Sequence, residues 1–211
     1  AYVQAAQTAI GKLSVATLDG YKEEVNKVTD VANADNEAVK KAFVDLAEEG
    51  FSLTALNTDV PAKVTEYAEA STAMSAAVTA VKAAIWVDAV LGDAAWNSNI
   101  SDAAGVKTAL KAYKDDLDAE TNKYEIELVD ALLAEDDVTL YNGTIATAKA
   151  SINAVLDGVE AKYTANKTLA TNISTAYSTF ATDKVSTKAE YDAVIETVTV
   201  PGGDPVEKEA L

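Results

Sequence analysis

Apolar side chains recur at alternating steps of three and four residues in four long segments of the sequence. Because an α-helix completes a turn in about 3.6 residues, this spacing places them on one face of a helix. The opposite positions carry mostly lysine, aspartate, glutamate and threonine, so each segment has a narrow apolar seam suited to coiled-coil-like packing. The four seams are Leu18, Tyr21, Val25, Val28 and Ala32; Val64, Tyr67, Met74, Val78, Val81 and Ile85; Leu110, Tyr113, Leu117, Tyr124, Leu128 and Ala131; and Ile145, Ala148, Ile152, Val155, Val159, Leu169, Ile173, Tyr177 and Phe180.

Proline and capping residues indicate where these helices begin and end. Residues 62–200 contain no proline, so long helices are permitted there. Phe51, Ser52 and Leu56 have the spacing of a hydrophobic staple, in which a polar side chain caps free N–H groups and two apolar groups pack across it. We expect helices over residues 2–12, 15–48, 60–91, 101–134, 140–181 and 187–197, with a break in the second near residues 33–36.

These helices predict an all-α fold: an elongated antiparallel helical bundle, built as tandem three-helix bundles. The first bundle is expected over residues 1–96 and the second over residues 97–198, although one up-and-down bundle fits the same pattern. Residues 199–211 are expected to form a linker or tail. Residues 197–200 alternate like a short extended segment, and residues 201–205 are rich in turn formers. Two alternatives for this end are an exit to a further domain and a strand donated to a neighbouring subunit.

The composition excludes most catalytic chemistry. The chain has no cysteine and no histidine, and its 17 basic residues are all lysine. It therefore has no thiol nucleophile, no imidazole base, no imidazole or thiolate metal ligand and no guanidinium group to clamp phosphate. We expect a protein that is not an enzyme, with no catalytic residues and no cofactor.

Carboxylates are the remaining candidates for chemistry. Asp115, Asp116 and Asp118 lie close together, and a second acidic cluster occupies residues 135–137. Glycoside hydrolysis needs two carboxylates at a fixed separation across a cleft, whereas clusters on exposed helix faces or at helix ends are solvated charge. Calcium takes oxygen ligands only, so residues 135–137 or the turn at Asp204 could hold this ion at an assembly contact, although no EF-hand spacing occurs.

The net charge of −17 limits the partners. A chain this acidic cannot neutralise a run of phosphates, so we expect no nucleic-acid partner, and adhesion to anionic lipid is disfavoured. The most apolar segment, residues 74–91, is interrupted by Lys82 and Asp88. We therefore expect a buried helix there and no membrane span, with an inserting hairpin as the alternative.

Four Asn-X-Ser/Thr sequons, the acceptor pattern for N-glycosylation, occur between residues 99 and 174. They begin at Asn99, Asn142, Asn166 and Asn172. Asn99 and Asn142 lie near predicted helix breaks, so they are the better candidates for modification.

Aromatic residues could form a platform on which a sugar stacks. Five of the nine tyrosines lie on the apolar seams, so core packing is the expected role of the aromatic residues. Trp96 falls in a predicted break between helices. It is therefore the aromatic residue that we select as a candidate for ligand contact.

In composition and pattern the chain resembles bacterial surface-layer (S-layer) proteins and other Gram-positive-type cell-surface proteins. The features that carry the resemblance are an acidic, lysine-rich, cysteine-free sequence of alanine, threonine and valine. The breaks at Gly50-Phe51-Ser52 and Asp137-Val138-Thr139 are similar to those of helical repeats in such proteins. The resemblance implies a secreted protein located outside the cell, at the cell surface or cell wall.

We therefore expect a non-enzymatic structural subunit or spacer of an extracellular surface layer or filament, acting by self-assembly. Its partners would be copies of itself, neighbouring domains of a longer surface protein, or a cell-wall glycan. An adhesin module that binds a glycan or a protein through Trp96 is the alternative. A helical pore-forming toxin, with residues 74–91 as the inserting element, is the third hypothesis.

Overall fold

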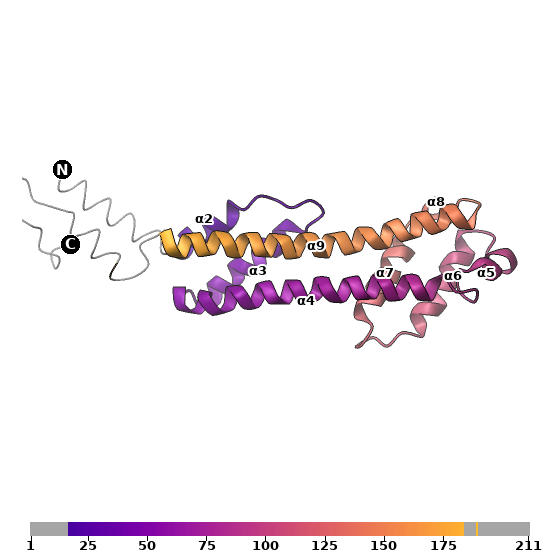
Figure 1. Ribbon diagram of the computed structural model, residues 1–211, viewed down its shortest axis with the longest axis horizontal. Coiled ribbons are helices and arrows are strands. Elements are labelled where there is room, and N and C mark those ends of the chain that lie inside the picture. The colour runs from indigo at the N-terminus through magenta and orange to yellow at the C-terminus, as the bar shows by residue number, and fades with distance from the viewer. Residues whose placement is uncertain (1–16, 184–188, 190–211) are drawn as a thin grey trace, which may run out of the picture. The chain divides into compact units, whose positions relative to one another are not determined.

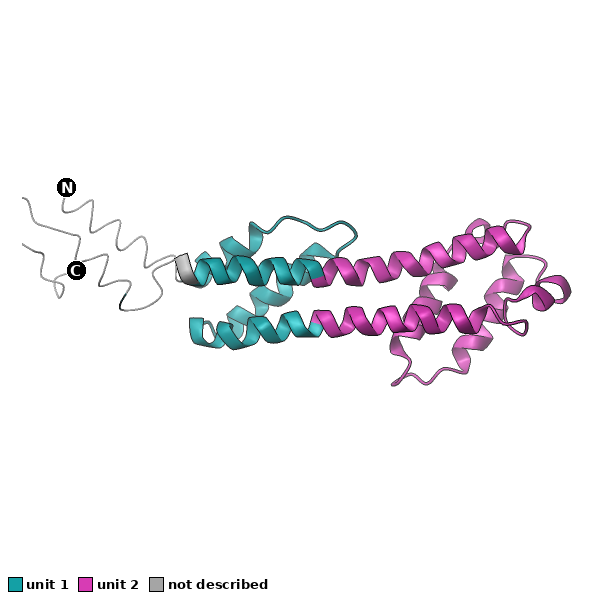
Figure 2. Cartoon of the chain, in the orientation of Figure 1, with its two compact units in different colours: residues 1–66, 168–211 teal, residues 67–167 magenta. Residues whose placement is uncertain are grey.

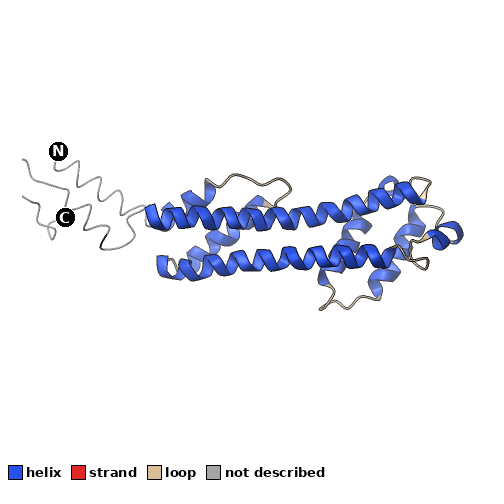
Figure 3. Cartoon of the chain, viewed as in Figure 1, coloured by secondary structure: helices blue, strands red, loops and turns tan. Residues whose placement is uncertain are grey.

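The computed structural model describes residues 17–183 and residue 189, and every regular element among them is an α-helix (Figures 1 and 3). The helices are α2 (Leu18–Asn26), α3 (Asn36–Glu49), α4 (Leu53–Ile85), α5 (Asp93–Ser98), α6 (Ala103–Asp115), α7 (Lys123–Ala134), α8 (Asp137–Leu140) and α9 (Ile145–Asp183). This confirms the all-α fold, but not the tandem three-helix arrangement. The predicted helices 2–12 and 187–197, apart from residue 189, and the tail at 199–211 lie outside the described residues.

The chain divides into two compact units (Figure 2). Unit 1 comprises residues 1–66 and 168–211, and unit 2 comprises residues 67–167. Both boundaries fall inside helices, so α4 and α9 each contribute residues to both units. The predicted boundary between residues 96 and 97 does not coincide with this division, because it lies inside α5 within unit 2. The domains expected over residues 1–96 and 97–198 stay a prediction.

Unit 1 packs α2 and α3 against the first part of α4 and the last part of α9. Its core contains an aromatic cluster, in which the ring of Tyr21 meets Tyr177 edge-on at 5.6 Å and Phe180 at 6.4 Å. The Tyr177 hydroxyl donates hydrogen bonds to the Leu53 carbonyl and to Asn57 Oδ1, each at 3.1 Å. These bonds join α9 to the first turn of α4.

Unit 2 builds its core from the rest of α4, the helices α5 to α8, and the first part of α9. The seam predicted in α4 is confirmed over residues 74–85, where Met74, Val81 and Ile85 are fully buried, whereas Tyr67 is half-buried. At the edge of the core, Trp86 Nε1 donates to Asn153 Oδ1 at 3.1 Å and links α9 to the segment after α4. For residues 74–85 the apolar spacing therefore predicts burial correctly, whereas the seam residue Ala32, in the connection after α2, is exposed.

Several predicted helices are shorter or divided in the structure. The segment predicted at 15–48 is two helices, α2 and α3, which confirms the predicted break near residues 33–36; the connection between them includes Asn33 at a φ of 63°. The segment predicted at 101–134 is also two helices, because the Asp118 carboxylate accepts the backbone N–H groups of Glu120 and Thr121 at 3.1 and 2.9 Å. Such local bonds compete with helix formation.

The start of α4 confirms Ser52 as the capping residue but not the predicted first residue of the helix. Ser52 Oγ accepts the Ala55 N–H at 3.0 Å and caps a helix that begins at Leu53 instead of residue 60. Pro61 therefore lies inside the helix. Proline lacks the N–H that would bond one turn back, and the predicted helix at 60–91 therefore has Pro61 in its first turn.

Asp102 caps α6, and its replacement tests how much one helix cap contributes to the stability of the fold. Asp102 Oδ1 accepts the Gly105 N–H at 2.8 Å. We expect Asp102→Ala to lower the free energy of unfolding by about 1 kcal/mol, because that N–H loses its partner. Asp102→Asn keeps an accepting oxygen and should retain most of the stability. Urea denaturation measures both variants, and equal losses in the two would contradict the capping role.

Candidate functional site

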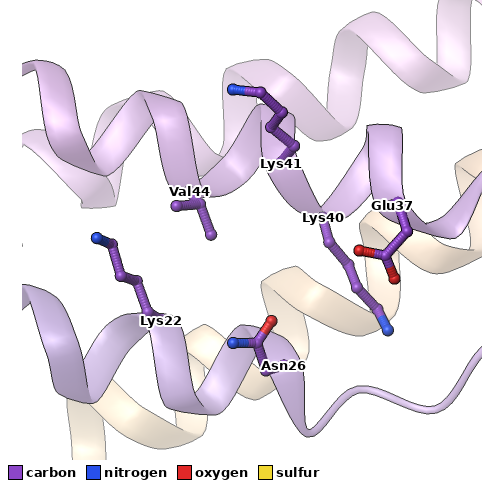
Figure 4. A pocket seen from close by; sticks show the side chains of 6 residues that line it. All are labelled: Lys22, Asn26, Glu37, Lys40, Lys41 and Val44. Atoms are coloured by element: carbon purple, nitrogen blue, oxygen red, sulfur yellow. The ribbon is translucent and has the colours of Figure 1, made fainter.

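Two surface hollows are the candidates for a binding site in the described part of the chain. The first, of about 260 Å³, lies in unit 1 between α2 and α3 (Figure 4). Lys22 and Asn26 line it from α2, and α3 contributes Lys40, Lys41 and Glu37. Three lysines around one hollow in so acidic a chain raise the question of an anion site.

The ammonium groups of this hollow are already paired with carboxylates. Lys22 Nζ lies 2.5 Å from Glu48 Oε1, and this hydrogen bond raises the pKa of the lysine. The other two pairs are Lys40 with Asp30 at 2.8 Å and Lys41 with Asp45 at 2.5 Å. Because each cation has an acidic partner, the hollow carries no excess of positive charge, and the arrangement does not favour an anion.

The second hollow, of about 370 Å³, lies in unit 2 at the end of α5. Two aromatic side chains form part of its wall: Trp96 from α5 and Tyr141 from the segment after α8. Their rings stack at a centroid distance of 5.5 Å and an interplanar angle of 18°. Polar residues 97–99 and 101 supply amide and hydroxyl groups. The volume is at the low end of the range for small-molecule sites, about 300–1,000 Å³.

Trp96, the residue selected from the sequence for ligand contact, belongs to the core of unit 2. Only 9% of it is exposed, and Tyr141 stacks against it. A sugar-stacking platform needs an exposed ring face. Trp96 therefore lines the hollow but offers it little surface, and the polar residues at the end of α5 and after it provide most of the chemistry there.

The acidic clusters serve local structure. Asp115 and Asp116 are exposed at the end of α6. Hydrogen bonds from the backbone N–H and hydroxyl of Thr121 lower the pKa of Asp118 in the next turn. These carboxylates do not face one another across either hollow, so the arrangement needed for glycoside hydrolysis is not formed by them.

The acidic cluster at residues 135–137 also serves local structure. Glu135 ends α7, and Asp136 caps α8 by accepting the Thr139 N–H at 2.7 Å, which lowers the pKa of its carboxyl. Asp137 pairs with Lys107 at 2.9 Å. No group of three or more metal-ligating side chains occurs within residues 17–183, and Asp204 lies outside the described residues. Calcium at an assembly contact stays a prediction.

The apolar segment 74–91 supplies core residues to unit 2. Met74, Val78 and Leu91 are buried there, together with Ile85. None of the described helices combines the length and the apolar character that crossing a membrane requires.

The structure also brings together two sequons that the sequence shows only as separate motifs. Asn99 and Ser101 line the second hollow, and so does Gly143, the middle residue of the sequon that begins at Asn142. The other two sequons, at Asn166 and Asn172, lie inside α9. No sequence signal links Asn99 with Gly143, because their proximity depends on how α5 and α8 pack in unit 2.

Comparisons of the chain with protein-family models, with curated proteins and with solved structures find no match.

Proposed function

We propose that the chain is a non-enzymatic structural segment of an extracellular surface layer or filament, where it acts as a spacer and as a self-assembly contact. The observation that supports this proposal is the continuity of α4 and α9, which contain 33 and 39 residues. At 1.5 Å per residue these helices are about 50 and about 58 Å long. Helices of this length suit a part whose task is to hold distance.

The length of α4 and α9 is stabilised by apolar packing. Isolated helices are marginal in water, so most helical stability in proteins comes from burying one face. Both long helices have such a face over most of their length. In α4 it includes Leu56, Val60, Met74, Val78, Val81 and Ile85, and in α9 it includes Ala148, Ile152, Leu156, Leu169, Ile173, Tyr177 and Phe180.

Charge would make assembly depend on ions. A net charge of −17 causes copies of the chain to repel one another when salt is low. Divalent cations at carboxylate-rich contacts would remove part of this repulsion. Among the described residues, Val87 and Val138 are the large apolar side chains that remain exposed, at 47% and 74%, and both lie in unit 2. They are the candidates for the apolar part of a contact.

Electron microscopy of the purified chain, with and without millimolar calcium, tests the proposal. We expect ordered sheets or fibres with calcium and fewer of them after chelation. A sodium chloride sample of the same ionic strength is the control, because it separates general screening from a specific effect of calcium. Dispersed particles in all three samples would refute self-assembly by this chain alone.

A glycan-binding module is the second candidate, supported by the polar hollow beside Trp96 and Tyr141. Asn97 tests it, because this residue lines the hollow and is exposed. Saturable binding of a cell-wall glycan that is lost in Asn97→Ala, while folding is unchanged, would favour this candidate. Equal binding by both proteins would exclude the hollow as the glycan site.

A further inference from the structure

Two N-glycosylation sequons that are distant in the sequence meet at one hollow in unit 2. The first runs from Asn99 to Ser101 and follows α5. The second runs from Asn142 to Thr144 and lies between α8 and α9. Asn99, Ser101 and Gly143 all line the hollow of about 370 Å³ that the pair Trp96 and Tyr141 helps to form.

Both sequons lie in connections between helices. Asn99 directly follows α5 as its C-cap, with a φ of −122° and a ψ of −24°, and Ser101 precedes α6. In the second sequon, Gly143 has a φ of 91°, a left-handed conformation that favours glycine. Asn99 and Asn142 are both exposed, and neither lies in a helix.

The amide nitrogens of these two residues are available. No hydrogen bond engages the Asn99 side chain among the described residues. The Asn142 side chain accepts a bond from the Thr147 hydroxyl at its carbonyl oxygen, which leaves the amide nitrogen without a partner in the described part of the chain. The nitrogen is the atom that bonds to the sugar.

The two sequons in α9 differ from those at Asn99 and Asn142 because they lie inside a helix. This position prevents a glycosylating enzyme from recognising them in the folded chain. N-glycosylation requires the asparagine and the hydroxyl residue two positions later to enter one active site together. On an α-helix, residues i and i+2 do not face each other. Asn166 and Thr168, and likewise Asn172 and Ser174, lie well inside α9. Their pairs of side chains therefore point in different directions.

We propose that Asn99 and Asn142 are N-glycan acceptor sites and that the hollow lined by Asn99 and Gly143 receives the first sugar of an attached glycan. In the transfer step, asparagine Nδ2 forms a bond to the anomeric carbon of a lipid-linked diphospho-oligosaccharide. The bond from that carbon to the phosphate oxygen breaks, the lipid diphosphate leaves with the electron pair, and the amide releases one proton to a base. This inference rests on the proposed location outside the cell.

The walls of the hollow suit a sugar attached at its rim. Tyr141 is half-buried and lines the hollow, with its ring stacked on Trp96, while the residues after α5 offer hydroxyl and amide groups. Sugars combine apolar faces with hydroxyl edges, so they are recognised by an aromatic surface together with hydrogen-bonding groups. A glycan at either asparagine would cover the hollow and add bulk to this end of unit 2.

Glycopeptide mass spectrometry of the full chain, isolated from the cells that make it, tests the proposal directly. We expect glycan on the peptides that contain Asn99 and Asn142 and none on those that contain Asn166 and Asn172. A chain recovered from the cell surface with both Asn99 and Asn142 unmodified would overturn the proposal.

Glycosylation of the folded, purified chain in vitro supplies matched controls. With an oligosaccharyltransferase and its lipid-linked donor, Ser101→Ala and Thr144→Ala should each remove one glycan. Thr168→Ala and Ser174→Ala, which destroy the two sequons in α9, should remove none. Equal modification of all four asparagines in the folded chain would contradict the structural argument.

Different results would contradict the structural role and the glycan acceptor sites. Ordered assemblies of a surface-exposed chain that carries no glycan would overturn the acceptor sites and leave the structural role intact. Glycan on Asn99 and Asn142 of a chain that remains dispersed with calcium would support the acceptor sites and refute self-assembly. An intracellular, unmodified chain would refute both.

Discussion

Replacing Trp96 with alanine is expected to lower the free energy of unfolding by about 3–5 kcal/mol. The side chain is 9% exposed and packs in the core of unit 2, where it stacks on Tyr141 at 5.5 Å. Its removal leaves a cavity that the surrounding helices can fill only partly, so the loss combines the transfer free energy and the cavity term. Denaturant unfolding followed by far-UV circular dichroism measures the change.

Trp96→Phe and Asn97→Ala are the controls for this experiment. Phenylalanine retains an apolar ring, so we expect a smaller loss than with alanine. Asn97 is exposed beside Trp96, and its replacement should change stability by no more than about 0.5 kcal/mol. An unchanged stability of Trp96→Ala would mean that the indole is not part of the core. Because the alanine variant is expected to be poorly stable, its loss of ligand binding would not identify a site.

The apolar periodicity of the sequence predicts which residues are buried, and it does so well in the long helices. In α9, the predicted residues Ile152, Ile173 and Phe180 are fully or almost fully buried. The pattern succeeds because a residue every three or four positions lies on one helix face whatever the helix packs against. Fold class follows from this local information alone.

The same periodicity fails to show where a helix stops. The seam predicted from Leu110 to Ala131 continues through the connection between α6 and α7, where Leu117 is half-buried outside any helix. The break results from the Asp118 carboxylate, which accepts N–H groups that a helix would otherwise use. A turn can keep the apolar spacing while it redirects the chain, so only the capping chemistry marks it.

The organisation into units could not be predicted, because it depends on pairings between distant residues. The Tyr177 hydroxyl bonds to the Leu53 carbonyl in unit 1, which joins the last helix of the described chain to the first turn of α4. Nothing in the local pattern of either segment specifies the other. The hollow in unit 2 has the same origin, since Trp96 and Tyr141 meet only when α5 and α8 have packed.

The chain is expected to lose stability steeply above about pH 10, and Tyr21 should account for a measurable part of the loss. Tyr21 is fully buried, and burial, with a smaller contribution from Tyr177, raises the pKa of its hydroxyl. Above the ordinary tyrosine pKa of about 10 the unfolded chain releases this proton and the folded chain keeps it. The unfolded state then binds fewer protons, so stability falls by about 1.4 kcal/mol per pH unit for this group.

Tyr21→Phe isolates this contribution and also changes stability at neutral pH. The Tyr21 hydroxyl has no hydrogen-bond partner in the described part of the chain, so its removal should raise the free energy of unfolding by on the order of 1 kcal/mol at pH 7. Above pH 10 the variant should lose stability with a shallower slope than the parent chain. Urea denaturation at a series of pH values measures both effects.

Tyr163→Phe is the matched control, because burial, followed by a hydrogen bond to Glu127, likewise raises the pKa of Tyr163. Its hydroxyl donates to Glu127 at 2.7 Å, so the substitution should lower stability at pH 7 by up to about 1 kcal/mol. In both variants the free energy of unfolding should fall less steeply above pH 10 than in the parent chain. Only the sign of the change in stability at pH 7 should differ between them. If Tyr21→Phe also destabilised the chain at pH 7, the hydroxyl would have to be satisfied by a buried water, and the core of unit 1 would be a hydrated one.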